Sequence, residues 1–399
     1  MDLACERCEV SGVSVGQSGR VLIVAGEASS SLYAQRILEA WQASGRKVDA
    51  FGIGSREMEA LGFRRLGKSE EMAVVGLSEV IKHFPLIRRV YHSLLDECDR
   101  IKPDFALLLD YPDFNLRLAK DLKKRGIKVV YYISPQVWAW RRGRVKLIKK
   151  VVDEILVLFP FEETFYREHG MKVSFVGHPL LDELVRRDSE GKSLPNIRRE
   201  KFGLQPFETV LGLMPGSRES ELKHHLQDQL AAAELLAKRY PQVRPVLLCA
   251  PTIERERLQG EVSNLSVPVQ IIKADPLDMI EMCDILLVAS GTATLMVGLL
   301  EKPMVIMYRM SPITAWFAKR LVTHTKFFGM VNLILEKEAM RELFQEAASP
   351  EGMATQLEQL LDENVRREKV LDLKLLKEKL GAVGATSRVV LRLEEYFAK

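Results

Sequence analysis

Two carboxylates stand three residues apart at the end of a short apolar run, Phe105–Leu109. Asp110 follows this run directly, and Asp113 comes just before Phe114. A carboxylate at the end of a buried strand is partly desolvated, which raises its pKa and suits it to general-base catalysis. Asp113 could instead cap the helix that should follow. We therefore expect Asp110 to be the chemically active member of the pair.

A third carboxylate, Glu27, lies in a turn of small residues. The turn Gly26-Glu27-Ala28-Ser29 comes directly after the apolar run Val21–Ala25. Small residues let a ligand approach the backbone closely, and Glu27 would place a charge beside it. An ordinary strand-to-helix turn with Ser29 or Ser30 as N-cap fits the same residues equally well. The G-x-G-x-x-G fingerprint is absent here, which argues against a nicotinamide-dependent dehydrogenase.

Two turns in the second half of the chain have the composition of anion-binding sites. Pro215-Gly216-Ser217-Arg218 joins an apolar run to a helix expected from about Glu219. Ser290-Gly291-Thr292-Ala293-Thr294 follows another apolar run and opens a second helix. Backbone N–H groups at a helix N-terminus bind phosphates, and Arg218 would add a fork of donors. Together the two turns indicate a nucleoside diphosphate, although neither is specific alone.

An aromatic and basic segment lies between these sites. Ser134-Pro135-Gln136-Val137-Trp138-Ala139-Trp140 is followed by four cations, Arg141, Arg142, Arg144 and Lys146. Paired tryptophans beside cations could bind a sugar face or a phosphate. The alternative is an aromatic corner of the core that leads into a solvated basic helix. Because cations at a helix N-terminus oppose the helix dipole, an anionic partner is the interpretation we favour.

The segment Glu70–Arg89 is apolar at helical spacing and is flanked by His83, Arg88 and Arg89. Packing in the core is the default explanation. The alternative is a helix at a membrane surface, with its cations against lipid headgroups. Periodicity alone does not separate the two.

Short apolar runs alternate with helical patterns along the chain, which predicts βαβ units and open parallel sheets. A polar stretch, Arg186–Glu200, interrupts the alternation, so we place a domain boundary within it or shortly after it. The expected fold is α/β, with two Rossmann-like domains that face a cleft. The expected strands are Val21–Ala25, Val48–Ile53, Phe105–Leu109, Val129–Ile133, Ile155–Leu158, Val173–Val176, Val210–Met214, Val246–Cys249, Val269–Ile272, Ile285–Val288 and Met304–Met307.

Length and composition agree with this organisation. A chain of 399 residues exceeds one ordinary core, and a net charge of +4 is too small to suggest bulk nucleic-acid binding. The five cysteines are an odd number, which favours reduced thiols and the cytoplasm. Cys5 and Cys8 form one C-x-x-C without further ligands, so we expect no metal site there. No uncharged apolar stretch is long enough to span a membrane.

These motifs, in this order, resemble lipid-A-disaccharide synthase. The similarity runs from about Val21 to about Leu361 and covers most of the chain. One match would be weak evidence, but eight in register are hard to obtain otherwise. They are Val24–Ser29 (VAGEAS), Asp110–Asn115 (DYPDFN), Ser134–Trp140 (SPQVWAW), Phe159–Glu162 (FPFE), Val176–Pro179 (VGHP), Pro215–Arg218 (PGSR), Ser290–Thr294 (SGTAT) and Pro303–Arg309 (PMVIMYR).

The resemblance implies an inverting glycosyltransferase of the GT-B type, with no cofactor and no bound metal. Such an enzyme would join UDP-2,3-diacylglucosamine to 2,3-diacylglucosamine 1-phosphate and release UDP. It would lie in the cytoplasm and be peripherally bound to the inner membrane. The resemblance implies no nucleic-acid partner and is compatible with an oligomer. The implied catalytic residues are Asp110, as base for the acceptor's 6-hydroxyl, and Glu27, which would position the acceptor.

The resemblance also implies two binding regions. The expected acceptor and phosphate contacts are Ser29, Trp138, Arg141 and Arg144. The expected donor contacts are Gly216, Ser217, Arg218, Ser290, Gly291, Thr292, Thr294, Arg309 and Asn332. The expected domains are an N-terminal extension at 1–20, an acceptor domain at 21–190, a donor domain at 200–370, and a helical segment at 371–399 that could pack back on the first domain.

Four departures from the family pattern fall near the expected cleft. Ser30-Ser31 replaces the usual Gly-Asp, Gln136 replaces a serine, Met296 replaces an acidic residue that commonly holds the ribose, and Val331 replaces a proline. These changes favour an alternative, a weakened or silent paralogue that binds a sugar nucleotide or lipid without turnover. Another UDP-sugar enzyme of the same fold, such as an epimerase or a peptidoglycan glycosyltransferase, is a further alternative. The DYPDFN and Trp138/Trp140 segments disfavour it.

Overall fold

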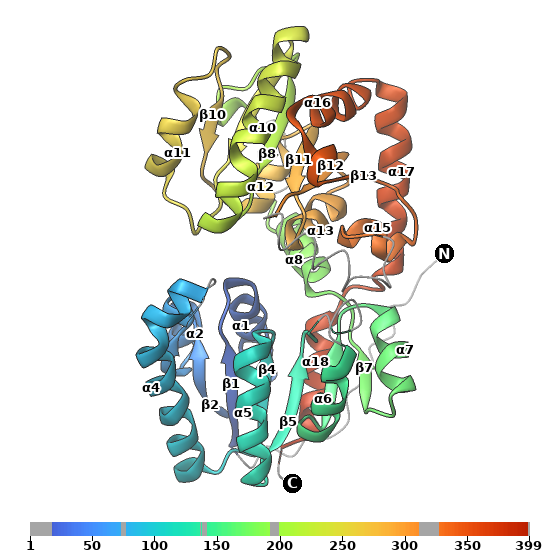
Figure 1. Cartoon of the computed structure of the whole chain (residues 1–399). Coiled ribbons are helices and arrows are strands. Elements are labelled where there is room, and N and C mark those ends of the chain that lie inside the picture. The colour runs from blue at the N-terminus through green and yellow to red at the C-terminus, as the bar shows by residue number, and fades with distance from the viewer. Residues whose placement is uncertain are drawn as a thin grey trace, which may run out of the picture.

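The computed structural model describes residues 18–72, 77–135, 137, 142–191, 199–310 and 327–397. These residues form two α/β units, one above the other in Figure 1. Each unit is built on one parallel sheet, because the strands are apolar runs buried on both faces by helices. The expected α/β class with two Rossmann-like units is therefore confirmed.

The N-terminal unit holds a seven-stranded sheet in the order β3-β2-β1-β4-β5-β6-β7. Its strands are β1 (Gly19–Ala25), β2 (Val48–Gly54), β3 (Arg64–Lys68), β4 (Phe105–Leu109), β5 (Lys128–Tyr132), β6 (Glu154–Val157) and β7 (Val173–Phe175). Its helices are α1 (Ala28–Ala43), α2 (Arg56–Ala60), α3 (Ser69–Met72), α4 (Leu77–Ile101), α5 (Pro112–Lys124), η1 (Arg142–Arg144), α6 (Val145–Val151), α7 (Pro160–Glu168) and α8 (Pro179–Ser189).

The C-terminal unit holds a six-stranded sheet in the order β10-β9-β8-β11-β12-β13. Its strands are β8 (Thr209–Met214), β9 (Val243–Leu248), β10 (Gln270–Ile272), β11 (Ile285–Ala289), β12 (Met304–Tyr308) and β13 (Arg341–Phe344). The helices after β8 are α10 (Glu219–Arg239), α11 (Arg255–Val262), α12 (Pro276–Glu281), α13 (Thr292–Leu299), α15 (Met330–Leu335), η2 (Gln345–Ala348), α16 (Pro350–Gln359), α17 (Glu363–Lys379) and α18 (Ala385–Glu394).

Several element boundaries differ from the sequence expectations. Strand β1 begins at Gly19 rather than Val21, and helix α1 follows from Ala28. The N-cap of α1 is Glu27, so neither Ser29 nor Ser30 caps this helix. The reason is that Ser30 occupies the third helical position, where its hydroxyl bonds back to the backbone of Glu27.

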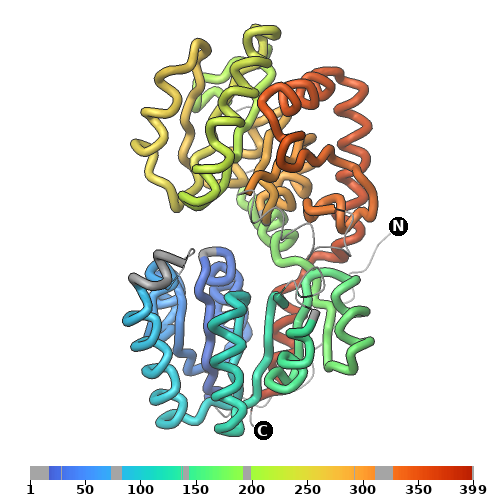
Figure 2. The backbone as a smooth tube through the Cα atoms, in the orientation of Figure 1, coloured from blue at the N-terminus to red at the C-terminus, as the bar shows by residue number. Residues whose placement is uncertain are grey.

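The last helix of the chain packs against the first unit. The trace in Figure 2 leaves the C-terminal unit after α17 and returns to the N-terminal sheet as α18. The Nε1 of Trp41 in α1 donates to Glu394 at 3.1 Å, and the ring of Phe397 lies 5.6 Å from that of Trp41. Helix α17 runs unbroken to Lys379, and the chain passes from one unit to the other around Gly381–Gly384.

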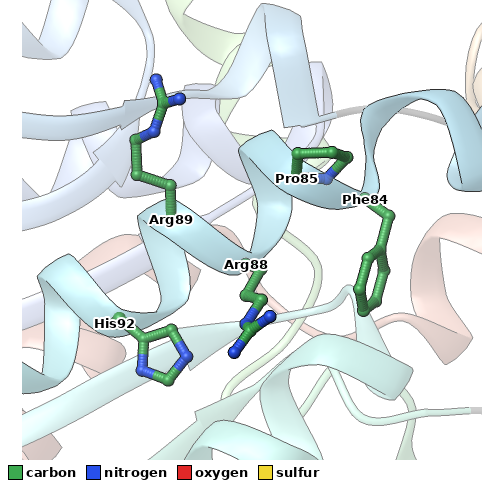
Figure 3. Close-up of a pocket in the computed structure, with 5 residues that line it drawn as sticks. All are labelled: Phe84, Pro85, Arg88, Arg89 and His92. Atoms are coloured by element: carbon green, nitrogen blue, oxygen red, sulfur yellow. The ribbon is translucent and has the colours of Figure 1, made fainter.

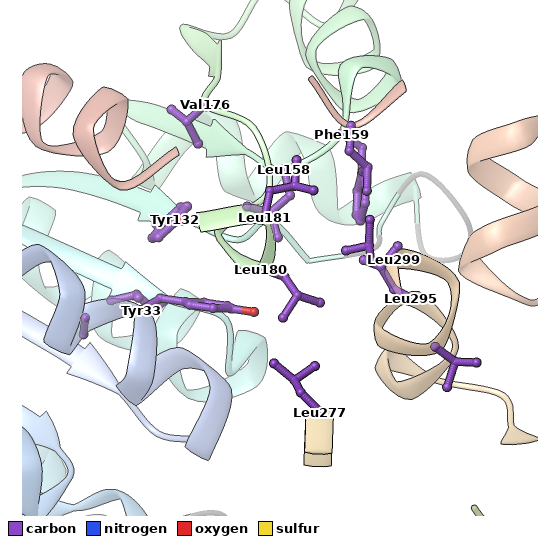
Figure 4. Packing of buried hydrophobic residues seen from close by; sticks show 14 of the residues in the cluster. Tyr33, Tyr132, Leu158, Phe159, Val176, Leu180, Leu181, Leu277, Leu295 and Leu299 are labelled. Atoms are coloured by element: carbon purple, nitrogen blue, oxygen red, sulfur yellow. The ribbon is translucent and has the colours of Figure 1, made fainter. Parts of the chain in front are cut away.

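The two units share one apolar contact region. Figure 4 shows Leu180 of α8 near Tyr33 of α1 and Leu277 of α12, with Leu181 beside Leu158 of the first unit. A buried arginine of α8, Arg187, adds ion pairs to α12, at 2.7 Å to Asp275 and 3.5 Å to Glu281. Helix α8 is therefore joined to both units by packing and by charge.

Candidate active site between the two sheets

The loops with the expected chemistry lie where the strand order of each sheet reverses. In the first sheet the order reverses between β1 and β4, and in the second between β8 and β11. Ligands of open parallel sheets bind beyond the carboxyl ends of the strands at such points. Ala25 pairs with Leu109, so the turns that begin at Gly26 and Asp110 are neighbours.

Asp110 and Tyr111 adopt an unusual backbone conformation. Both have a φ of 47°, in the left-handed region that residues with a side chain avoid. The conformation is held by hydrogen bonds to the carbonyl of Asp110, from the hydroxyl of Tyr131 at 2.5 Å and from Nδ2 of Asn115 at 2.7 Å. Strain of this kind, about 1–3 kcal/mol for each residue, is concentrated at functional sites.

The carboxyl group of Asp110 is tuned by its surroundings. Burial and the neighbouring Glu27 raise its pKa to about 6, while the Tyr111 backbone N–H and Arg218 act in the opposite direction. A carboxylate with such a pKa is ionised at neutral pH and still accepts a proton readily. Asp110 can therefore act as a general base.

Glu27 is brought to Asp110 by close packing of the two turns. A Cβ on Gly26 would lie 3.0 Å from the ring of Tyr111, so this position has no space for a larger residue. The hydroxyl of Ser30 accepts from the Glu27 N–H and donates to its carbonyl. Ser29 is exposed beside it. Ser31, one of the departures from the family pattern, is buried and donates to the carbonyl of Ala25 at 3.1 Å.

The Pro215–Arg218 turn is shaped by its glycine. Gly216 has a φ of +134°, and a Cβ there would meet Glu221 at 2.5 Å. The carboxylate of Glu221 accepts from the Ser217 N–H at 2.8 Å, and Thr252 donates to the Ser217 carbonyl. Arg218 is the N-cap of α10, so the turn stands at the positive end of a long helix.

Arg218 connects the two units across the site. Its Nη2 lies 3.7 Å from Oε2 of Glu27, and its Nη1 lies 3.5 Å from Oε1 of Glu221. Its guanidinium is half-exposed and accessible to a ligand. The carboxylates of the N-terminal unit and the arginine of the C-terminal unit thus form one charged cluster.

The second turn that was expected to bind an anion leads into α13. Gly291 is exposed and is the N-cap of α13, whose first residue is Thr292. The side chain of Thr292 lies outside the described residues. Thr294 is buried, and its hydroxyl donates to the carbonyl of Gly291 at 2.8 Å. The hydroxyl of Ser290 lies 3.4 Å from the carbonyl of Phe328, so Ser290 and Gly291 form the accessible part of the turn.

Arg309 and Asn332 have different surroundings. Arg309 stands at the end of β12, half-exposed, and is paired with Asp228 of α10. Asn332 has no exposed surface. Its amide donates to the Met340 carbonyl and to Glu342, and its carbonyl accepts from the Met340 N–H. A direct donor contact is therefore wrong for Asn332 in this conformation, because its hydrogen bonds are used to join α15 to β13.

The expected acceptor segment is only partly described. Trp138, Arg141 and Gln136 lie outside the described residues. Arg144 pairs with Asp113 at 2.6 Å, so the second carboxylate of the DYPDFN motif binds a cation instead of capping α5.

Two carboxylates with clear local functions were missed in the sequence. The buried Glu162 of the FPFE motif accepts from the hydroxyl of Ser134 at 2.8 Å and from two backbone N–H groups at the start of α7. Glu221 holds the Ser217 turn in the same way. Both stand at the third position of a helix, and this spacing was the signal available.

Comparison with known proteins agrees with this geometry. The model of the lipid-A-disaccharide synthetase family matches residues 21–391. A lipid-A-disaccharide synthase of Trichlorobacter lovleyi is 41% identical over 384 residues, which cover 94% of this chain and 97% of that protein. One of Geobacter metallireducens is 40% identical over 371 residues, which cover 93% of this chain and 95% of that protein.

Solved structures show the same architecture at low sequence identity. The UDP-GlcNAc 2-epimerase from Neisseria meningitidis, bound to UDP-GlcNAc, has a TM-score of 0.66 and 14% identity, and the match covers 94% of this chain and 100% of that one. At this identity the likeness establishes the fold alone. The family match and the curated relatives go further: the chain belongs to the lipid-A-disaccharide synthase family and is a hexose-transferring enzyme of the GT-B type.

Proposed function

We propose that this enzyme joins UDP-2,3-diacylglucosamine to 2,3-diacylglucosamine 1-phosphate, with Asp110 as general base. The observation that carries the assignment is the position of Asp110. This carboxyl, with a pKa of about 6, lies beside Glu27 and close to Arg218 of the facing unit. In the reaction Asp110 removes the proton from the acceptor's 6-hydroxyl while its oxygen attacks the anomeric carbon of the donor. The bond from that carbon to the diphosphate breaks, and UDP leaves with its electron pair.

The donor side stabilises the negative charge that grows on the diphosphate. Arg218 supplies a bidentate cation, and the N-termini of α10 and α13 supply backbone N–H groups. The direct donor contacts that we propose are Gly216, Ser217, Arg218, Ser290, Gly291, Thr292 and Arg309. Thr294 and Asn332 act through the backbone that they hold. No step in this scheme draws on a metal ion or a cofactor.

The acceptor side is assigned from charge and accessibility. Glu27 orients the acceptor hydroxyl next to Asp110, and the exposed Ser29 lies on the same turn. Arg144, with Trp138 and Arg141, is proposed to bind the sugar and its 1-phosphate. In this scheme a phosphate displaces Asp113 from Arg144, which is feasible because Asp113 is 79% exposed and surface ion pairs are weak.

The decisive experiment is an assay with purified components. The protein is incubated with UDP-2,3-diacylglucosamine and 2,3-diacylglucosamine 1-phosphate, and disaccharide and UDP are measured by mass spectrometry. We expect both products in equal amounts, and their loss in Asp110→Ala. UDP binding without any product from the wild type would support the silent paralogue. Product formed at the wild-type rate by Asp110→Ala would remove Asp110 as base.

We further propose that the N-terminal part of α4 binds an anionic membrane surface. Figure 3 shows a shallow pocket on this helix lined by Phe84, Pro85, Arg88, Arg89 and His92. Phe84 is 53% exposed, and the two arginines are exposed beside it. Because α4 leads from β3 to the start of β4, its N-terminus lies at the same sheet edge as Asp110. An acylated acceptor could thus pass from the bilayer to the site.

A matched pair of variants distinguishes membrane binding by α4 from nonspecific adsorption to vesicles. In the part of the chain that the structure describes, no helix is long and apolar enough to cross a membrane. We expect the wild type to sediment with phosphatidylglycerol vesicles and Phe84→Glu to stay in solution. The control is Phe207→Glu, which changes a phenylalanine that is 78% exposed on the other unit. Equal sedimentation of all three proteins would contradict the proposal.

A further inference from the structure

A buried histidine lies behind the Pro215–Arg218 turn and the end of β12, outside the catalytic scheme. His225 is in the second turn of α10, and only 3% of its surface is exposed. Its Nδ1 lies 2.9 Å from the carbonyl of Pro215, and its Nε2 lies 2.9 Å from the carbonyl of Arg309. One ring therefore touches the backbone at the ends of two separate strands, β8 and β12.

The neutral ring can bond to both strand ends in one tautomer. With the proton on Nδ1, the ring donates to the Pro215 carbonyl. Its Nε2 is then free to accept from the N–H of Arg309, which lies 3.4 Å away. With the proton on Nε2, the ring donates to the Arg309 carbonyl and leaves Nδ1 facing a carbonyl that cannot donate. The first tautomer uses both ring nitrogens but leaves Nε2 facing the Arg309 carbonyl at 2.9 Å, so the ring contacts both strand ends in either tautomer.

Two neighbours on the same face of α10 support the same arrangement. Asp228 and Gln229 follow His225 by three and four residues, so their side chains emerge from one side of the helix. Asp228 pairs with the guanidinium of Arg309, and Nε2 of Gln229 donates to the Met214 carbonyl at 3.3 Å. The partners of all three side chains belong to the ends of β8 and β12.

An ordinary core histidine would have partners within its own layer of the core. The partners of His225 are instead the residue before Gly216 and Ser217, and the backbone of Arg309. We propose that His225 is a positioning residue that fixes the Pro215–Arg218 turn relative to Arg309, so that both meet the diphosphate and nucleoside of a UDP-sugar at once. This inference rests on the proposed donor site, and no contact of His225 with substrate is part of it.

The test compares three substitutions by UDP titration calorimetry, donor and acceptor KM, and thermal unfolding. His225→Phe keeps the ring volume and removes both hydrogen bonds. His225→Gln carries one donor and one acceptor and can replace them. His224→Phe makes the same change at the exposed neighbouring residue and is the matched control.

We expect His225→Phe to weaken UDP binding and raise the donor KM about tenfold, the equivalent of about 1.4 kcal/mol, with the acceptor KM unchanged. His225→Gln should recover most of this loss, and His224→Phe should behave as the wild type. If His225→Phe does not fold, His225→Asn, which is too short to reach both turns, should show the same split between the donor and acceptor KM.

Three results would overturn the inference. The first is a folded His225→Phe that binds UDP as tightly as the wild type. The second is a parallel rise of donor and acceptor KM that follows the loss of thermal stability, which is the sign of a purely structural role. The third is a wild type that binds no UDP. By contrast, the expected UDP pattern in a protein that forms no disaccharide would refute the proposed reaction and leave the role of His225 intact.

Discussion

Asp110 combines two opposing electrostatic influences. Burial and Glu27 make its ionised form less stable, whereas Arg218 and the Tyr111 N–H stabilise it. As a result, the carboxyl group of Asp110 is ionised at neutral pH, but its ionised form is less stable than that of a carboxyl group in water. The same burial that prepares Asp110 to take a proton also destabilises the folded protein.

The first prediction concerns the pH dependence of the reaction. The base must be ionised, so kcat/KM should fall about tenfold for each pH unit below the pKa of about 6 and level off above it. Initial rates from pH 5 to 8, corrected for protein stability, measure this. A rate that does not change between pH 5 and 7 would contradict the assignment of Asp110.

The second prediction concerns stability in Asp110→Asn. The pKa of Asp110 is raised from 3.8 to about 6, so the folded state binds the proton more tightly than the unfolded chain. Ionisation above pH 6 therefore costs about 3 kcal/mol of folding free energy, which the amide does not incur. Asp110→Asn should melt at a higher temperature than the wild type at pH 7.5, and the difference should shrink toward pH 4. Activity should fall about 10²–10⁴-fold.

How far the sequence predicts the site depends on the kind of contact. Asp110, Glu27 and Arg218 were found because they follow apolar strands, and parallel sheets gather such loops at one edge. Their roles remain predictions. Glu221 was missed although its place at the third position of a helix was a usable signal. His225 was missed because its partners are backbone groups, which leave no mark in the sequence. Asn332 was matched by its identity, but its burial became visible only in the fold.

At the level of elements, helix α13 explains two of the departures from the family pattern. Its sequence, TATLMVGL, contains no charged residue. A Cβ on Gly298 would lie 2.8 Å from both Val331 of α15 and Leu376 of α17, so this helix is packed tightly on both neighbours. Val331 is fully buried at its contact with α13. Met296, which is part of α13, packs against the core. Both changes therefore extend the apolar packing of α13.

The third prediction restores a charge on α13. Met296→Glu places a carboxylate one turn after the Ser290–Thr294 turn, where the family pattern has its ribose ligand. We expect UDP to bind about tenfold more tightly, since hydrogen bonds to a charged group contribute about 1.5–3 kcal/mol, part of which offsets the lost packing. Calorimetry with UDP measures the gain. Met330→Glu, a partly buried methionine on α15, is the control, and an equal response of both variants would count against a ribose contact.

Two of the four edge strands, one in each sheet, were missed in the sequence, whereas β7 and β10 were expected. Strands β3 (RRLGK) and β13 (RELF) were not expected, because they carry charges and no apolar run. Charged residues are typical of edge strands, where they prevent pairing with another chain. Central strands were found to within a few residues because burial on both faces requires an apolar sequence.

At the scale of the molecule, a buried carboxylate secures the return of α18 to the first unit. Glu154 of β6 has no exposed surface and meets Arg392 and Lys172 at 2.7 Å and the hydroxyl of Tyr396 at 2.6 Å. Burial works against its ionisation, but the hydrogen bonds from Lys172, Tyr396 and Arg392 hold its pKa below the ordinary value. The network is therefore stabilising only while Glu154 is charged.

The fourth prediction follows from the direction of this pKa shift. The ionised Glu154 stabilises the folded protein at pH values above the ordinary pKa of a carboxyl group. This stabilisation is lost as the pH falls through the lower pKa that Glu154 has in the folded state. Glu154→Gln should destabilise the protein by about 3 kcal/mol at pH 7, because Arg392 and Lys172 lose their shared partner. The difference from the wild type should diminish in acid. Glu395→Gln, an exposed partner of the same two cations, should have little effect in the same unfolding experiments.

The return of α18 also determines the order in which the protein can be completed during synthesis. The ring of Phe397 packs 5.1 Å from that of Phe105 and lies directly on Gly19 of β1. When the ribosome has made the first sheet, the residues that cover it are still some 200 positions from being translated. Domains usually fold as they emerge, N-terminal first. Here the unit that is made first is completed only when α18 has been made, so we expect its nascent form to expose Trp41 and Phe105, which favours binding by chaperones.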